Sequence, residues 1–115
     1  MSNDKYRECI EACNACAVAC SYCSTACLQE DDVKMLTRCI QLDQDCADIC
    51  QLAAKSMARG SEFSDRIFLI CAEICEACGE ECRQHKNMEH CQECADACFE
   101  CADMCREMIS MKVPA

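Results

Sequence analysis

Cysteine, rather than leucine or valine, sets the apolar periodicity of this 115-residue chain. In the first segment the spacing alternates between four and three residues, at Cys9, Cys13, Cys16, Cys20, Cys23 and Cys27. At about 100° per residue, this heptad spacing places all of these side chains on one stripe of a helix. A strand would need apolar residues at every second position. The pattern therefore predicts an α-helix with one cysteine-covered face.

Three later segments follow the same spacing, although the second contains fewer cysteines. Their cysteines are Cys39, Cys46 and Cys50, then Cys71, Cys75, Cys78 and Cys82, then Cys91, Cys94, Cys98, Cys101 and Cys105. In the second segment, Met35, Leu42 or Asp43, Ala53 and Met57 are expected to fill the rest of the cysteine-bearing face. We expect Asp43 to lean outward to the surface. Alternatively, its carboxylate binds a metal near Cys39 and Cys46.

Short polar breaks separate these segments. Residues 29–32 predict a turn, with Asp31 or Asp32 as the N-cap of the second helix. Residues 59–61 combine a basic helix end, a C′ glycine and a capping serine, and residues 85–87 end the third helix. Connections this short favour antiparallel neighbours. We therefore predict an all-α fold, an antiparallel up-down-up-down four-helix bundle with a cysteine-lined core.

Composition narrows the class of protein. The length fits a single domain covering residues 1–115. With 18 cysteines but only 2 glycines and 1 proline, and 52% apolar residues, the chain resembles neither a loop-rich disulfide scaffold nor a metallothionein. A net charge of −10 argues against nucleic-acid binding. We see no export signal and no membrane span, so we expect a cytoplasmic protein whose thiols stay reduced.

The cysteines are better explained as metal ligands than as disulfides or packing residues. Cysteines one helical turn apart have Cβ atoms about 5–6 Å apart, whereas a disulfide needs roughly 3.5–4.5 Å. Disulfides between helices would need nine matched pairs from 18 unevenly distributed cysteines. Packing explains one or two buried cysteines, but not whole stripes of them. Thiolates aligned in this way suit soft ions, namely Cu(I), Zn(II) or Fe–S clusters.

Charge favours several Cu(I) ions per chain. A Zn(II) ion with four thiolates carries two negative charges, and several such sites would accumulate buried charge. One bridging thiolate per Cu(I) leaves the core neutral. Iron–sulfur ligands usually lie in loop motifs, which this chain lacks. An Fe–S redox protein or a Zn(II) store remains the alternative.

We expect no enzyme, because no nucleophile–base pair is apparent. The ferritin-like Glu-x-x-His motif is also absent, since Glu81 precedes His85 by four residues rather than three.

The two ends of the predicted bundle differ in chemistry. One end gathers His85, His90, Met35 and Met88 around the cysteines, and soft ions are expected to enter there. Whether these residues bind metal themselves is left open. The opposite end gathers Tyr6, Cys9, Met57, Ile67, Phe68, Cys105 and Met108, and we expect it to form an apolar plug.

These repeated C-x-x-x-C-x-x-C-x-x-x-C motifs, from Tyr6 to Met108, resemble the cytosolic bacterial copper storage proteins. The resemblance implies a four-helix bundle that stores and buffers many Cu(I) ions without catalysis, and a homotetramer. It also implies that all 18 cysteines are ligands, assisted by a histidine near the mouth, His85 or His90. We expect delivery by a copper chaperone or a thiol donor. Lateral isoleucines (Ile10, Ile70, Ile74) are candidates for the interface between copies.

Overall fold

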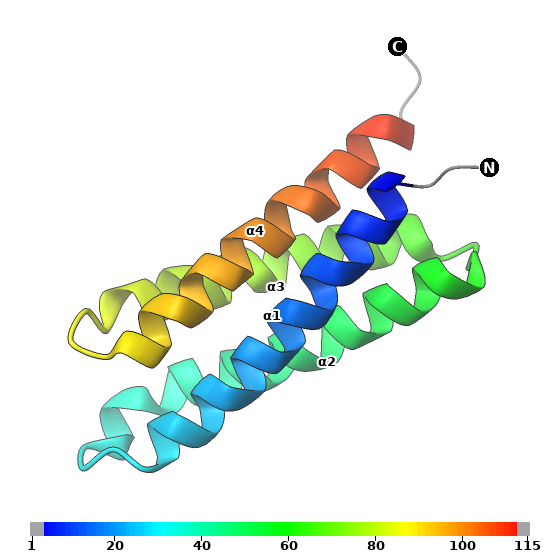
Figure 1. The fold of residues 1–115 in the computed structure, drawn as a ribbon. Coiled ribbons are helices and arrows are strands. Elements are labelled where there is room, and N and C mark those ends of the chain that lie inside the picture. Colours follow the sequence, from blue (N-terminus) through cyan, green and yellow to red (C-terminus); the bar gives the residue numbers. More distant parts are fainter. Residues whose placement is uncertain (1–3, 113–115) are drawn as a thin grey trace.

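The structure is a computed structural model that describes residues 4–112, with side chains for residues 5–110. Four long helices are joined by short connections (Figure 1). Helix α1 spans Asp4–Leu28, α2 Thr37–Arg59, α3 Ser64–Gln84 and α4 Glu89–Lys112, and a short 3₁₀ helix, η1, covers Val33–Leu36. Residues 4–112 contain no strand. The predicted all-α four-helix bundle is therefore confirmed.

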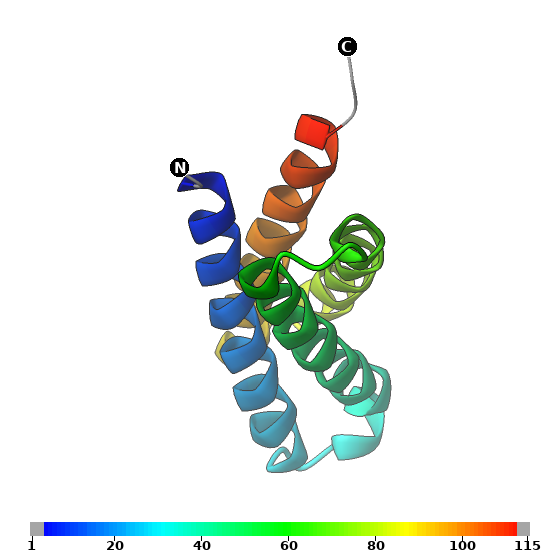
Figure 2. The same cartoon turned by 90° about the vertical axis from the view of Figure 1, so that its right-hand side faces the viewer.

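Successive helices run in opposite directions, so the connections fall at two ends of the bundle (Figures 1 and 2). The connections α1–α2 and α3–α4 share one end, which we call the mouth. The start of α1, the end of α4 and the α2–α3 connection share the other, which we call the closed end. Helix α1 packs most extensively on α2, and α3 on α4. This up-down-up-down order brings the two predicted histidines to the mouth.

The α2–α3 connection follows the prediction for its glycine, but the predicted serine cap is wrong, because α3 begins at Ser64 after Phe63 and no side chain caps it. Gly60 has φ 67° and ψ 41°, a left-handed conformation that ends α2 without a side-chain penalty. Its N–H donates to the carbonyl of Met57, and the N–H of Ser61 donates to Ser56, as in a Schellman motif. The hydroxyl of Ser61 then accepts the N–H of Phe63 just before α3 begins.

The α1–α2 connection differs from the prediction. Asp32 precedes η1 rather than α2, and its side chain makes no capping hydrogen bond. Helix α2 begins only at Thr37, whose hydroxyl donates to the carbonyl of Lys34. The predicted aspartate cap is wrong because the chain uses a 3₁₀ turn to cross the end of the bundle before α2 can start.

No helix among residues 4–112 is both long and apolar enough to span a bilayer. Buried alanines on each helix, such as Ala17, Ala47, Ala72 and Ala95, surround the cysteines. Alanine favours the helix, and its small side chain allows close approach between neighbours. The core that results is built mainly from cysteine, where an ordinary bundle would use leucine, isoleucine and valine.

Candidate metal centre

All 18 cysteines are free thiols and lie inside the bundle. Each has an exposed fraction of 1% or less. The heptad spacing explains this burial, because residues three and four apart on a helix return to the same face. The predicted cysteine-lined core is therefore confirmed.

The closest sulfur atoms belong to different helices. The Sγ of Cys46 on α2 lies 3.4 Å from the Sγ of Cys75 on α3 and 3.6 Å from that of Cys16 on α1. Thiols one turn apart on a single helix are slightly farther from each other, at 3.9 Å for Cys16 and Cys20. An ion held by neighbouring sulfurs would therefore be shared between helices.

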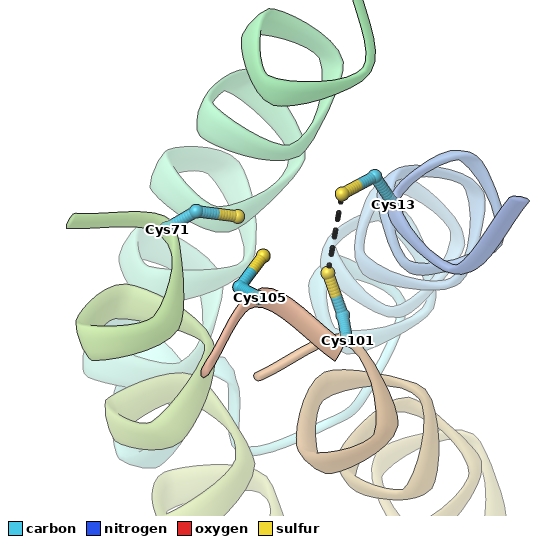
Figure 3. Close-up of side chains that lie close together, drawn as sticks. All are labelled: Cys13, Cys71, Cys101 and Cys105. Carbon is cyan, nitrogen blue, oxygen red and sulfur yellow. Dashed lines mark hydrogen bonds between the residues drawn. The ribbon is translucent and has the colours of Figure 1, made fainter. Parts of the chain in front are cut away.

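Several sets of four thiols are close enough to surround one ion, because their Sγ atoms all lie within 4.8 Å of one another. One set near the closed end is drawn in Figure 3 and comprises Cys13, Cys71, Cys101 and Cys105 from three helices. Sets in the middle share members: Cys16, Cys46, Cys50 and Cys75; Cys16, Cys20, Cys46 and Cys98; Cys20, Cys78, Cys94 and Cys98. Because the middle sets overlap, their thiols form a continuous array rather than isolated sites, and Cys50 lies 3.7 Å from Cys101 of the set near the closed end. Bridging soft ions suit such an array.

Asp43 lies within the thiol array, which corrects the prediction that its side chain leans outward. Its side chain is fully buried, at 0% exposed. Its Oδ1 accepts hydrogen bonds from the thiols of Cys78 at 3.1 Å and Cys94 at 3.4 Å. Burial and the neighbouring Cys94 and Cys78 raise the pKa of Asp43 from 3.8 to about 10, so the carboxyl is neutral at pH 7. The prediction followed the usual cost of burying a carboxylate, although the spacing from Cys39 and Cys46 is in phase with the cysteine face.

His90 lies at the mouth with one side of its ring against thiols. Its Nδ1 is 3.6 Å from the Sγ atoms of Cys23 and Cys91 and 3.9 Å from that of Cys27. These four side chains form another set with ligand atoms within 4.8 Å of one another. Its Nε2 lies 3.0 Å from Oε2 of Glu30, in the α1–α2 connection. The predicted histidine near the mouth therefore has both a thiol side and a carboxylate side.

His85 lies at the same end, but its described hydrogen bond is to a carboxylate. Its Nε2 is 2.9 Å from Oε2 of Glu81, one turn earlier on α3. The other oxygen of Glu81 lies 3.4 Å from Nε of Arg38 on α2. Glu81 is thus shared between a histidine and an arginine, which links α2 to α3 beside the mouth.

Methionines lie at both ends of the bundle, but the prediction that Met35 fills the cysteine-bearing face of the second helix is wrong, because Met35 lies on η1 before α2 begins. Met35 on η1 is 69% exposed, and Met88 is half-buried before α4. At the closed end Met57, Phe68 and Met108 are buried. The thiol array therefore ends in an apolar plug on one side and in histidine, carboxylate and thioether groups on the other.

Burial favours the protonated form of the Cys27 thiol. For Cys27, near the mouth, burial and then the nearby Cys39 raise the pKa of the thiol from 9.0 to about 12. A thiol with this pKa carries its proton at neutral pH. Binding of a soft ion as thiolate would therefore release protons.

The sequence model of the copper storage protein (Csp) family matches residues 2–110. The chain belongs to the copper storage protein family. A curated relative, the cysteine-rich protein YhjQ of Bacillus subtilis (strain 168), is 53% identical over 95 residues, which cover 82% of this chain and 87% of the relative. That relative is described as uncharacterized.

This copper storage family member is also similar to solved structures. Apo copper storage protein 3 from Bacillus subtilis is 52% identical, with a TM-score of 0.84, over 90% of this chain and 97% of that one. A cytosolic copper storage protein from Streptomyces lividans with five coppers is 41% identical, with a TM-score of 0.90, over 93% of each chain. The similarity spans nearly the whole bundle, and it confirms the family resemblance.

Proposed function

We propose that this chain stores and buffers many Cu(I) ions along its thiol core and catalyses no reaction. The observation that carries this proposal is the overlap between buried four-thiol sets from α1 to α4. The ligands would be all 18 cysteines together with His90, whose Nδ1 faces thiols. His85 would bind through Nδ1, because Glu81 lies against its Nε2.

Charge and the relatives both support Cu(I) as the stored ion. Cu(I) with one bridging thiolate per ion leaves the core without net charge, whereas repeated four-thiolate Zn(II) sites would bury several negative charges. One similar structure is described as the Cu(I)-bound copper storage protein BsCsp3. Another, from Streptomyces lividans, is loaded with 10 copper equivalents.

Anaerobic titration of the reduced protein with a coloured Cu(I) chelate tests the proposal. We expect each chain to remove many equivalents of Cu(I) from the chelate before saturating. Cys46→Ser with Cys75→Ser should lower that number. Ser56→Ala with Ser64→Ala should leave it unchanged, because these buried residues bear no thiol. Saturation of the parent protein at about one to four equivalents, the capacity of a single metal site or cluster, would contradict storage.

We further propose that the protein acts in the cytoplasm and receives Cu(I) from a copper chaperone or a thiol donor. A core of free thiols needs a reducing compartment, since an oxidising one would favour disulfides. Cu(I) held by a donor's thiols can pass to this chain by ligand exchange, without free copper. Transfer from Cu(I)–glutathione to the apo protein tests this step, and retention of the metal by glutathione in excess protein would contradict it.

We also propose a homotetramer in which the α2–α3 face is an interface. Ile70 is 42% exposed, and Ile74 lies on the same face of α3. Leu52 on α2 adds a further exposed apolar side chain, at 43%. Sedimentation should show four chains for the parent and fewer for Ile70→Asp with Leu52→Asp. Val18→Asp, on an exposed part of α1, should leave the assembly intact. A monomeric parent protein would contradict the proposal.

A further inference from the structure

We propose that Glu30 is a positioning residue for Cu(I) capture, which holds the His90 ring with Nδ1 directed at the thiols of the mouth. The inference rests on the proposed storage function and assigns a role to a residue outside the thiol array. Its basis is the pair of contacts made by opposite sides of one ring: Nε2 to Glu30 at 3.0 Å, and Nδ1 to Cys23 and Cys91 at 3.6 Å.

The chemistry of the two partners determines where the ring carries its proton. An ionised carboxylate can only accept a hydrogen bond, so Nε2 must be the protonated nitrogen that donates to Glu30. In the neutral ring Nδ1 is then unprotonated, and its lone pair faces Cys23, Cys27 and Cys91. This is the form of imidazole that binds a metal ion. The Glu30 contact therefore selects a ring prepared for an ion at the thiol side.

The place of Glu30 in the fold makes this contact a bridge across the mouth. Glu30 lies between α1 and η1, and His90 lies in the first turn of α4, 60 residues later. The His90 side chain is 13% exposed and that of Glu30 is 38% exposed, so the carboxylate lies on the solvent side of the ring. A flip of the ring would put carbon atoms where Nδ1 and Nε2 now lie, which would break the hydrogen bond to Glu30 and turn the Nδ1 lone pair away from the thiols. The contact therefore restrains ring orientation as well as tautomer.

The other histidine at the mouth provides an internal comparison. His85 also has a carboxylate on Nε2, but Glu81 lies on the last turn of α3, four residues earlier, and also contacts Arg38. The Glu81 contact therefore holds α2, α3 and His85 together, whereas the Glu30 contact acts on a ring that faces three thiols. Carboxylates that orient a metal-binding histidine commonly change metal affinity or activity by about 10- to 100-fold when removed.

The protonation of the two His90 ring nitrogens in the apo protein shows directly whether Glu30 positions the ring. In ¹⁵N–¹H spectra of the reduced, metal-free parent, we expect His90 to carry its proton on Nε2, with Nδ1 unprotonated. Glu30→Gln should keep this form, because the amide oxygen can accept the same hydrogen bond. Glu30→Ala should change the His90 ring signals and leave those of His85 in place. Glu81→Gln is the matched control and should leave His90 unchanged. Identical His90 signals in the parent and Glu30→Ala would overturn the proposal.

Capture kinetics test the consequence for copper. The probe is Cu(I)–bicinchoninate, mixed anaerobically with excess apo protein, and the initial rate of colour loss is measured. We expect Glu30→Ala to slow this rate about tenfold. Glu30→Gln should remain close to the parent, and the final number of ions should be the same for all three. In a His90→Ala background, Glu30→Ala should have no further effect.

The outcomes separate this inference from the proposed function. If the parent itself takes up few ions, storage is contradicted. If the parent loads fully but Glu30→Ala captures the probe at the parent rate, storage stands and positioning is overturned. An effect of Glu30→Ala that persists in the His90→Ala background would also overturn positioning, because Glu30 would then act through the loop or its charge.

Discussion

Asp43 is a carboxylic acid surrounded by thiols, and its environment makes it neutral. Folding removes the group from water, which disfavours the charged carboxylate, and the nearby Cys94 and Cys78 raise its pKa as well. Its Oδ1 then accepts S–H hydrogen bonds from Cys78 and Cys94. A buried carboxyl with these partners satisfies its hydrogen-bonding groups without an ion pair.

The raised pKa of Asp43 predicts how the stability of the apo protein depends on pH. The unfolded chain loses the Asp43 proton above about pH 4, while the folded chain keeps it up to about pH 10. Between these values the folded state binds one more proton, so the free energy of unfolding falls as pH rises, by up to about 1.4 kcal/mol per unit.

Urea unfolding of the reduced apo protein at pH 5, 6 and 7 measures this slope. Thiols of the unfolded chain are protonated throughout this range, so they contribute little to it. The Asp43→Asn variant cannot titrate at this position and should show a flatter dependence than the parent. Equal slopes for the two proteins would contradict a neutral Asp43 in the folded state.

The residues of the site differ in how well their positions could be predicted from the sequence. The cysteine ligands follow from their spacing, because the heptad fixes which face of a helix each one occupies. The spacing also places Asp43 on that face, but a carboxylate side chain is usually found at the protein surface, so the sequence alone favours an exposed Asp43. Glu30 gives no local signal, since its partner His90 is 60 residues away. The two residues come together only because the α1–α2 connection and the first turn of α4 lie side by side at the mouth.

At the scale of elements, the α2–α3 corner depends on the backbone of one residue. Gly60 has φ 67°, and a Cβ built there would have no neighbouring atom within 4 Å. Replacement by alanine therefore meets no steric clash with the rest of the bundle, and any loss must come from the left-handed backbone itself. That conformation costs an ordinary residue about 1–2 kcal/mol.

We accordingly expect Gly60→Ala to lower the free energy of unfolding of the apo protein by about 1–2 kcal/mol. Gly60→Asn should cost less, because asparagine tolerates this conformation better. Chemical denaturation measures both variants, with Arg59→Ala as a neighbouring control. A stability of Gly60→Ala equal to that of the parent would show that the corner can adopt another backbone conformation.

The helices themselves were predictable because three features agree along the chain: the heptad spacing, the alanine content and the short polar breaks. The start of α2 was not, because Val33–Leu36 forms η1 before the chain turns into the bundle. The distance that the connection must cross between α1 and α2 determines whether such a turn forms, and this distance cannot be predicted from the sequence pattern. That residues 1–115 form a single domain stays a prediction.

At the scale of the whole molecule, the bundle has one polar end and one apolar end, with buried thiols along the core between them. Buried Met57, Phe68 and Met108 close one end. Histidine, carboxylate and methionine side chains surround the other. We expect ions to enter at the mouth and pass inward by exchange between neighbouring sulfurs, which lie 3.4 to 4.0 Å apart in the described contacts.

Anomalous diffraction at the copper absorption edge, from crystals of the Cu(I)-loaded protein, tests the central claim most directly. We predict a row of copper peaks along the bundle axis, between sulfurs of the overlapping sets and also beside Nδ1 of His90 at the mouth. Copper confined to surface carboxylates, or to one site with the remaining thiols empty after full loading, would contradict storage within the core.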